Sequence, residues 1–137
     1  MNIKERAIIA AIQAMKKAIS FRTKVGACLY TQDKLFPGFN IENKTHKGYH
    51  AEEVAIIKAL DKQINPEDFI GIIIAYDFKD IYPACGSCRQ YLWEYTNPEL
   101  LITVVDIHGN IRYEAKLKEL YPMPYPKERW YKERYYK

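Results

Sequence analysis

Residues 69–77, FIGIIIAYD, form a continuous apolar run of strand length, and this run limits the folds that the chain can adopt. Strands that are hydrophobic on both sides usually lie in the middle of a sheet whose two faces are covered. The chain offers helices for this purpose, because apolar residues recur at helical spacing in residues 3–19 and 50–64. These three segments indicate a layered α/β architecture.

Other segments supply the remaining strands and a short helix. Residues 24–31 and 35–41 predict two strands joined by a turn at 32–34, and residues 43–49 are polar and predict a loop. A helix is predicted from about Cys88 to Tyr95, because Asn-Pro follows shortly after it.

The sequence LLITVVDIHGNIRYEA at residues 100–115 predicts two strands around a tight turn at residues 108–110. A connection this short joins antiparallel neighbours, because parallel strands need a crossover of a dozen or more residues. We therefore predict a three-layer α/β/α sandwich around a mixed sheet of about five strands, the last two antiparallel.

The charge is uneven along the 137 residues. The tail at 127–137, KERWYKERYYK, carries +3 of the net charge of +4, so residues 1–126 have almost no excess of basic groups. We expect one folded domain over 1–126 followed by this basic aromatic tail at 127–137. A helix that packs on the body or on another subunit is the favoured interpretation of the tail. Interleaved basic and aromatic residues also suit single-stranded RNA, so binding of nucleic acid through the tail is the alternative.

The N-terminal segment at 1–19 is interrupted by charged residues, and its apolar part is too short for a membrane span or a cleavable signal. We therefore expect a cytoplasmic protein with no membrane partner. In a reducing compartment, the pair Cys85 and Cys88 is more typical of a metal or redox site than of a disulfide.

Two cysteines form half of a zinc site, and the remaining ligands are sought among His, Asp and Glu side chains. The histidines are His46, His50 and His108; His50 begins a predicted helix and is followed by Glu52. Both halves lie at predicted helix starts, where free N–H groups and the helix dipole lower thiol pKa values. Three ligands, an open position for water and an adjacent carboxylate are typical of a catalytic zinc.

Simpler interpretations exist for each of these residues. A closed structural zinc with His46 as fourth ligand and a thioredoxin-like redox pair are the two alternatives for the cysteines. Cys28 is expected to be a buried core thiol. The simplest interpretation of Asn40 and Glu42 is that they cap a loop. The simplest interpretation of Arg89 is a solvated helix residue.

Two motifs resemble the signature of the zinc-dependent cytidine deaminases: HAE at 50–52 and PACGSCRQ at 83–90. GFNIEN at 38–43 is also similar to the nucleoside-binding segment of that family, and the resemblance covers residues 22–125. It implies that His50, Cys85 and Cys88 hold one zinc ion per chain. Glu52 is implied to shuttle protons between water, N3 of the pyrimidine and the departing amine.

The same resemblance implies a substrate site and a homotetramer. Asn40 and Glu42 then hydrogen-bond the ribose, the Ala51 backbone contacts the base, and Arg89 supports the thiolates. The residues implied to contact the nucleoside are Phe39, Asn40, Glu42, Ala51 and Tyr125, the last in the pocket of a neighbouring subunit.

The chain departs from the family pattern at four positions and in one loop length. Thr23 stands where the family has a phenylalanine that stacks on the base, and Ala84 separates Pro83 from Cys85. Tetrameric members often have a third cysteine and an arginine where this chain has His50 and Glu53, and the loop from Asn40 to His50 is one residue shorter. Because of Thr23, no residue of this chain is assigned to stack on the base.

The predicted activity is hydrolytic deamination of cytidine or deoxycytidine in pyrimidine salvage. The alternatives are a modified cytosine nucleoside, such as blasticidin S, and cytosine within RNA or DNA. Relatives that act on RNA or DNA reach a parallel fifth strand through an intervening helix, so the short turn at 108–110 favours a free nucleoside.

Overall fold

A mixed five-stranded sheet forms the centre of the molecule in the computed structural model, which describes residues 1–77 and 79–126. The strands of this sheet are β1 (Val25–Tyr30), β2 (Leu35–Phe39), β5 (Gly71–Tyr76), β6 (Leu101–Val105) and β7 (Ile111–Lys116). Their order is β2-β1-β5-β6-β7, and the β5–β6 pair alone is parallel among these neighbours. The β6–β7 pair is antiparallel, as the short turn predicts.

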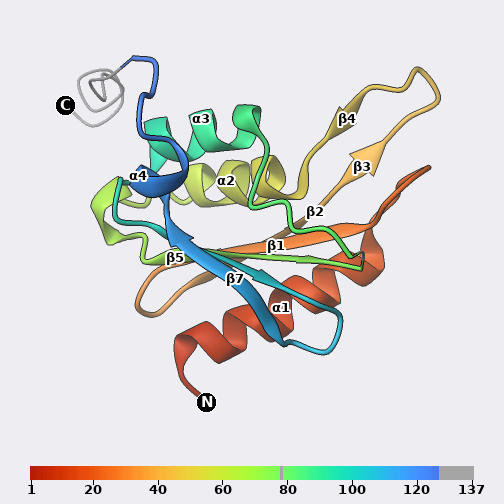
Figure 1. Cartoon of the computed structure of the whole chain (residues 1–137), viewed down its shortest axis with the longest axis horizontal. Helices are drawn as coiled ribbons and strands as arrows, with labels where there is room; N and C mark the ends of the chain where they lie inside the picture. The colour runs from red at the N-terminus through yellow and green to blue at the C-terminus, as the bar shows by residue number, and fades with distance from the viewer. Residues whose placement is uncertain (78, 127–137) are drawn as a thin grey trace.

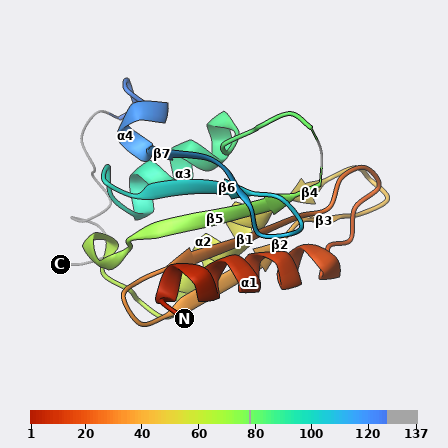
Figure 2. The same ribbon diagram turned by 60° about the horizontal axis from the view of Figure 1, so that its bottom comes forward.

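Helices cover both faces of the sheet (Figure 1). The helices are α1 (Ile3–Lys17), α2 (Ala51–Asp61), α3 (Gly86–Tyr95), α4 (Leu117–Leu120) and a 3₁₀ turn at Pro66–Asp68. Helix α1 lies on one face, while α2 and α3 lie on the other, and a second view shows the same separation (Figure 2). The predicted α/β/α sandwich is confirmed.

Strand β5 shows why the apolar run at 69–77 required two covered faces. All six of its residues are buried. Ile72 and Ile74 belong to the core beneath α2 and α3, whereas Ile73 and Ala75 belong to the core beneath α1. Alternate side chains point to opposite faces of a strand, so each face of β5 needs its own apolar layer.

Two glycines let the helices approach the sheet closely. A Cβ atom on Gly26 would lie 2.0 Å from the carbonyl oxygen of Ala11 in α1. A Cβ atom on Gly38 in β2 would lie 2.5 Å from the carbonyl oxygen of Ala51 and 2.6 Å from the nitrogen of Ala55. The absence of a side chain at Gly38 therefore determines how near to the sheet the first turn of α2 lies.

The structure differs from the sequence predictions at helix boundaries and in one loop. The helix predicted for 50–64 ends at Asp61, and α3 begins at Gly86 rather than near Cys88. The predicted loop at 43–49 contains strand β4 (Gly48–Tyr49), which pairs with β3 (Ile41–Glu42) in a two-stranded ribbon that projects from the body (Figure 1). That prediction was partly wrong, because polar composition does not show that two short segments will pair.

The tail at 127–137 lies outside the described residues, so the boundary at 126 stays a prediction. Among the described residues, no helix has the length and apolar character that a membrane crossing requires.

Replacing Gly38 by alanine tests the close approach of α2. We expect Gly38→Ala to lower the free energy of unfolding by about 1–3 kcal/mol, because the new methyl group would meet helix backbone that cannot move aside cheaply. Urea denaturation followed by circular dichroism measures this change. Gly86→Ala is the matched control, since nothing lies within 4 Å of a Cβ there, and it should change stability by less than about 1 kcal/mol. Equal stability of the two variants would contradict the proposed packing.

Candidate active site

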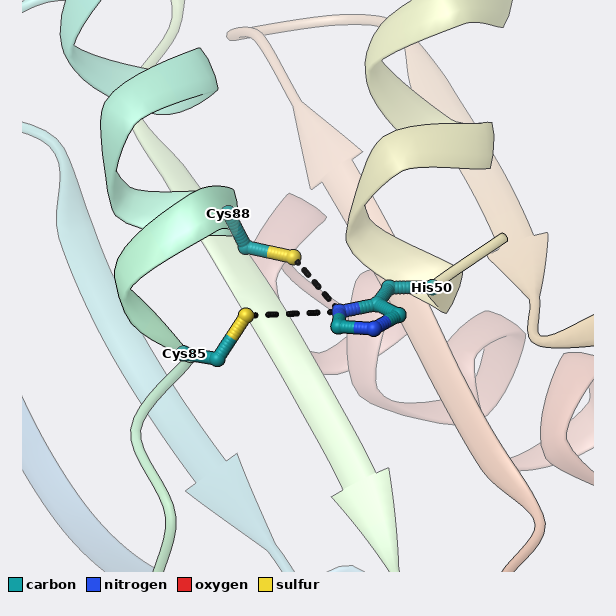
Figure 3. Close-up of side chains that lie close together, drawn as sticks. All are labelled: His50, Cys85 and Cys88. Atoms are coloured by element: carbon teal, nitrogen blue, oxygen red, sulfur yellow. Dashed lines mark hydrogen bonds between the residues drawn. The ribbon is translucent and has the colours of Figure 1, made fainter. Parts of the chain in front are cut away.

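The N-terminal ends of α2 and α3 bring three metal-binding side chains together (Figure 3). His50 is the N-cap residue of α2, Cys85 is the N-cap residue of α3, and Cys88 lies in the first turn of α3. The backbone N–H of His50 donates to Oε1 of Glu53 at 2.9 Å, which fixes the start of α2. The ligand side chains thus extend from two rigid helix starts.

The three ligand atoms are close enough to share one ion. His50 Nδ1 lies 3.2 Å from Cys88 Sγ and 3.3 Å from Cys85 Sγ, and the three atoms all lie within 4.8 Å of one another. Figure 3 shows the imidazole ring directed toward both sulfurs. Tetrahedral zinc, with bonds of about 2.0–2.3 Å, needs donors roughly 3.5–3.8 Å apart, and one nitrogen with two sulfurs is a donor set typical of zinc. The residues fit zinc.

Glu52 provides a buried carboxyl group beside these ligands. Its exposed fraction is 5%, and its side chain hydrogen-bonds to Cys88. Burial raises the pKa of Glu52 above its ordinary value. A carboxyl group with a raised pKa is suited to accepting a proton and returning it near neutral pH.

The Cys88 thiol behaves differently from what the helix start alone predicts. Burial, followed by the adjacent charge of Glu52, raises the pKa of Cys88 well above its ordinary value. A thiolate there depends on a cation that takes up the negative charge, and metal binding would release the proton.

A pocket of about 310 Å³ opens beside Glu52 and His50. It is lined by Arg22, Thr23, Val25, Asn40, Glu42, His50, Ala51, Glu52, Ile74, Tyr76, Tyr82, Ala84 and Cys85. This volume is at the lower end of the range for small-molecule sites. The lining includes two of the three metal-binding residues and the carboxyl group, so a molecule in the pocket would lie next to them.

Asn40 and Glu42 both line this pocket, and each also has a partner within the chain. The Asn40 amide accepts from the backbone N–H of Val25 at 2.8 Å and donates to the carbonyl of Thr23 at 2.7 Å. Asn40 therefore holds the segment that forms one pocket wall. Glu42 accepts from the hydroxyl of Ser20 at 2.5 Å, which fixes its carboxylate at the pocket edge.

The other predicted site residues differ in whether they line the pocket. Ala51 lines the pocket as the first residue of α2, but Phe39 is a half-buried residue of β2 outside the lining. Tyr125 lies outside it too, with 82% of its surface exposed. The Arg89 guanidinium donates to the carbonyls of Pro83 at 3.3 Å and Leu120 at 3.0 Å, so its predicted contact with the thiolates stays a prediction.

Sequence reasoning missed Tyr76 and Tyr82, which line the pocket from the end of β5 and from the loop before α3. Tyr76 belongs to the apolar run at 69–77, which was interpreted as a strand alone, and Tyr82 directly precedes the PACGSCRQ motif. The available signal was their position, because residues at the end of a central strand and just before a metal-binding motif often lie at the site.

The structure also bears on the alternatives for the cysteines. The metal-binding group found among the described residues does not include His46, whose ring packs edge-on against Phe21 with centroids 6.1 Å apart. The closed zinc site is therefore not supported. Cys28 is completely buried in the core beneath α1, and burial raises the pKa of its thiol to about 12.

Comparison with known proteins identifies the family. Residues 1–104 match the family model described as the cytidine and deoxycytidylate deaminase zinc-binding region. A cytidine deaminase of Halalkalibacterium halodurans is 33% identical over 116 residues, which cover 82% of this chain and 86% of that protein. A cytidine deaminase of Sporosarcina psychrophila is 29% identical over 106 residues, which cover 76% of each chain.

A solved structure agrees with these sequence relatives. The crystal structure of cytidine deaminase from Burkholderia pseudomallei has a TM-score of 0.80 and 31% identity, covering 90% of this chain and 99% of that chain. The matched region contains both helix starts that carry the ligand atoms. The chain therefore belongs to the cytidine and deoxycytidylate deaminase family of zinc-binding enzymes.

Proposed function

We propose that this enzyme hydrolyses free cytidine and deoxycytidine to uridine and deoxyuridine with release of ammonia, as a step of pyrimidine salvage. The observation that carries the proposal is the buried carboxyl group of Glu52 beside three metal-ligand atoms at one pocket. Hydrolytic removal of an amine requires an activated water and a group that moves protons, and this arrangement supplies a place for both.

The residues that would hold zinc, one ion per chain, are His50, Cys85 and Cys88. When bound, zinc lowers the pKa of a coordinated water to about 7 and so makes a nucleophile available at neutral pH. Glu52 takes one proton from the attacking water and passes it to N3 of the base. It then takes the second proton from the hydroxyl group on C4 and delivers it to the amine, which leaves as ammonia while the C4 carbonyl forms. Its burial supports this role, because a carboxyl group that is too acidic would not return the proton.

The first turn of α2 contributes more than Glu52. The N–H of Ala51 lies at the start of a helix, where backbone donors lack partners within the helix. We assign to the Ala51 backbone a hydrogen bond with the base. Glu42 and Asn40 are assigned to the ribose, and the Ser20 hydroxyl keeps the Glu42 carboxylate at the pocket edge.

We further propose that the enzyme is a homotetramer in the cytoplasm. The segment before the tail is tied to α3, because Gln90 donates to the carbonyl of Tyr125 and Trp93 donates to the carbonyl of Pro126 at 3.0 Å. The Tyr125 side chain nevertheless remains 82% exposed. A fixed backbone with an exposed ring supports the assignment of Tyr125 to the pocket of a neighbouring subunit. The three free cysteines agree with a reducing compartment.

The second candidate function is deamination of a modified cytosine nucleoside or of cytosine in RNA or DNA. The antiparallel β6–β7 pair supports a free nucleoside over a base within nucleic acid, as argued from the sequence. An ultraviolet assay of zinc-loaded protein on cytidine, deoxycytidine, cytosine, blasticidin S and a short RNA distinguishes these substrates. We expect turnover of the first two; turnover restricted to RNA or blasticidin S would contradict the proposal.

Removal of the two site cysteines should remove the metal. We expect Cys85→Ala/Cys88→Ala protein to contain almost no zinc after dialysis, because a single histidine remains of the ligand set. Elemental analysis by mass spectrometry measures the zinc content per chain. Cys28→Ala is the matched control and should retain about one zinc ion, since Cys28 lies in the core beneath α1. Full zinc retention in the double variant would show that the ligands are elsewhere.

Glu52→Gln should nearly abolish deamination while the protein keeps its fold and zinc. The amide has almost the same shape but cannot accept and return a proton, and such catalysis is worth roughly 100- to 10,000-fold in rate. Steady-state kinetics with cytidine measures the loss. Glu99→Gln is the control, because Glu99 is an exposed carboxylate paired with Lys116 and Lys118. A Glu52→Gln enzyme with half of its activity would exclude the proposed proton shuttle.

The ribose assignment predicts a strong preference for nucleoside over free base. Asn40 and Glu42 are assigned hydrogen bonds with the ribose that free cytosine cannot make, and a hydrogen bond to a charged group such as the Glu42 carboxylate is worth about 1.5–3 kcal/mol. Cytosine should therefore be a far poorer substrate than cytidine. We expect Glu42→Ala to lower kcat/KM for cytidine but not for cytosine, and so to narrow the ratio between them. Equal kcat/KM for both substrates in the unmodified enzyme would refute the assignment.

A further inference from the structure

The backbone of Tyr82 is held on both sides in the loop between β5 and α3. Its N–H donates to the hydroxyl oxygen of Tyr76, and its carbonyl accepts from the N–H of Ala84 at 2.9 Å. Tyr76 is itself buried at the end of β5, so it forms a rigid support. These two hydrogen bonds restrict where the Tyr82 side chain can lie.

The residues that follow Tyr82 fix the loop further. Ala84 has a φ of 66°, a left-handed conformation that is uncommon for residues other than glycine and that proline cannot adopt. The carbonyl of Pro83 accepts from Nε of Arg89 at 3.3 Å. The surrounding contacts therefore maintain a costly backbone conformation, and such conformations cluster at functional sites.

The Tyr82 ring is packed and tethered, but it is also accessible from the pocket. Its centroid lies 6.3 Å from that of Tyr76, with 46° between the two rings. Its hydroxyl donates to Oδ2 of Asp80 at 3.3 Å. The residue lines the pocket and is 55% exposed. A ring that is already ordered loses little conformational entropy when a flat ligand packs against it.

The segment at residues 22–25 contributes no aromatic ring to the pocket. Thr23 and Val25 line the pocket there, and both side chains are small. Phe21 is the phenylalanine nearest to Thr23 in the sequence. It is 62% exposed, packs against His46 and does not line the pocket. Among the described lining residues, Tyr76 and Tyr82 are the two that carry a six-membered aromatic ring, and Tyr76 is almost completely buried.

We propose that Tyr82 is the residue of this chain that stacks on the pyrimidine, and that Tyr76 is a positioning residue that holds Tyr82 in place. The inference rests on the proposed function, because it takes a cytosine nucleoside as the ligand. Stacking on a tyrosine strengthens the binding of substrate and transition state alike, so its loss should appear in KM rather than in kcat. The stacking surface thus comes from the loop before α3 rather than from the segment that contains Thr23.

The test compares four zinc-loaded variants with the unmodified enzyme. Tyr82→Ala should raise KM for cytidine roughly 5- to 150-fold with kcat nearly unchanged, since that is the usual effect of removing a base-stacking ring. Tyr82→Phe keeps the ring and should restore KM. Tyr76→Phe keeps a ring but loses the hydroxyl that accepts from Tyr82, and should raise KM to an intermediate value. Tyr113→Ala, a half-exposed tyrosine of β7 outside the pocket, is the control.

Equilibrium titration with uridine provides a second readout that does not depend on turnover. We expect Tyr82→Ala to weaken uridine binding by a similar factor while thermal melting shows an intact fold. Unchanged KM and uridine affinity in Tyr82→Ala would overturn the inference and leave the proposed function intact. Impairment of Tyr82→Phe equal to that of Tyr82→Ala would also overturn it, because the hydroxyl would then be responsible. An unmodified enzyme that leaves cytidine unchanged would overturn both.

Discussion

The N-termini of α2 and α3 meet at a single pocket, where they bring His50, Cys85 and Cys88 within reach of one ion. Buried polar groups accumulate there, and the pKa values of both Glu52 and Cys88 are raised by burial. Such groups oppose folding unless a partner compensates them. One zinc ion with two thiolates and a neutral imidazole would have no net charge. Metal binding would therefore offset the free-energy cost of burying these groups. Metal affinity and fold stability are therefore coupled at this site.

The sheet fixes the positions of these two helix starts. Gly38 lets the first turn of α2 lie against β2, and β5 passes beneath both helices to end at Tyr76 beside the pocket. Side-chain hydrogen bonds hold the pocket walls in place, for example those of the Asn40 amide with the backbone of Thr23 and Val25. Rigid elements hold the ligand atoms and Glu52, while loops shape the space for the substrate. This division agrees with the general observation that specificity resides in loops on a fixed scaffold.

The fold was predictable because its main determinants are local in the sequence. The apolar run of β5 requires helices on both faces, and the turn at 108–110 forces an antiparallel pair. The grouping of His50, Cys85 and Cys88 with Glu52 was predictable because their residue types and spacing match a zinc site with an adjacent carboxyl group. The left-handed conformation of Ala84, the support of Tyr82 by Tyr76 and the raised pKa of Cys88 were not predictable, because each depends on contacts between distant segments or on burial.

The central claim is that this site adds water to C4 of a cytosine nucleoside and expels the amine. Incubation of the zinc-loaded enzyme with cytidine in water labelled with the heavy oxygen isotope tests this claim most directly. Mass spectrometry should find uridine with one heavy oxygen in its base, together with ammonia in equal amount, while uridine incubated alone stays unlabelled. Uridine without the label, or cytidine that remains unconverted, would contradict the account.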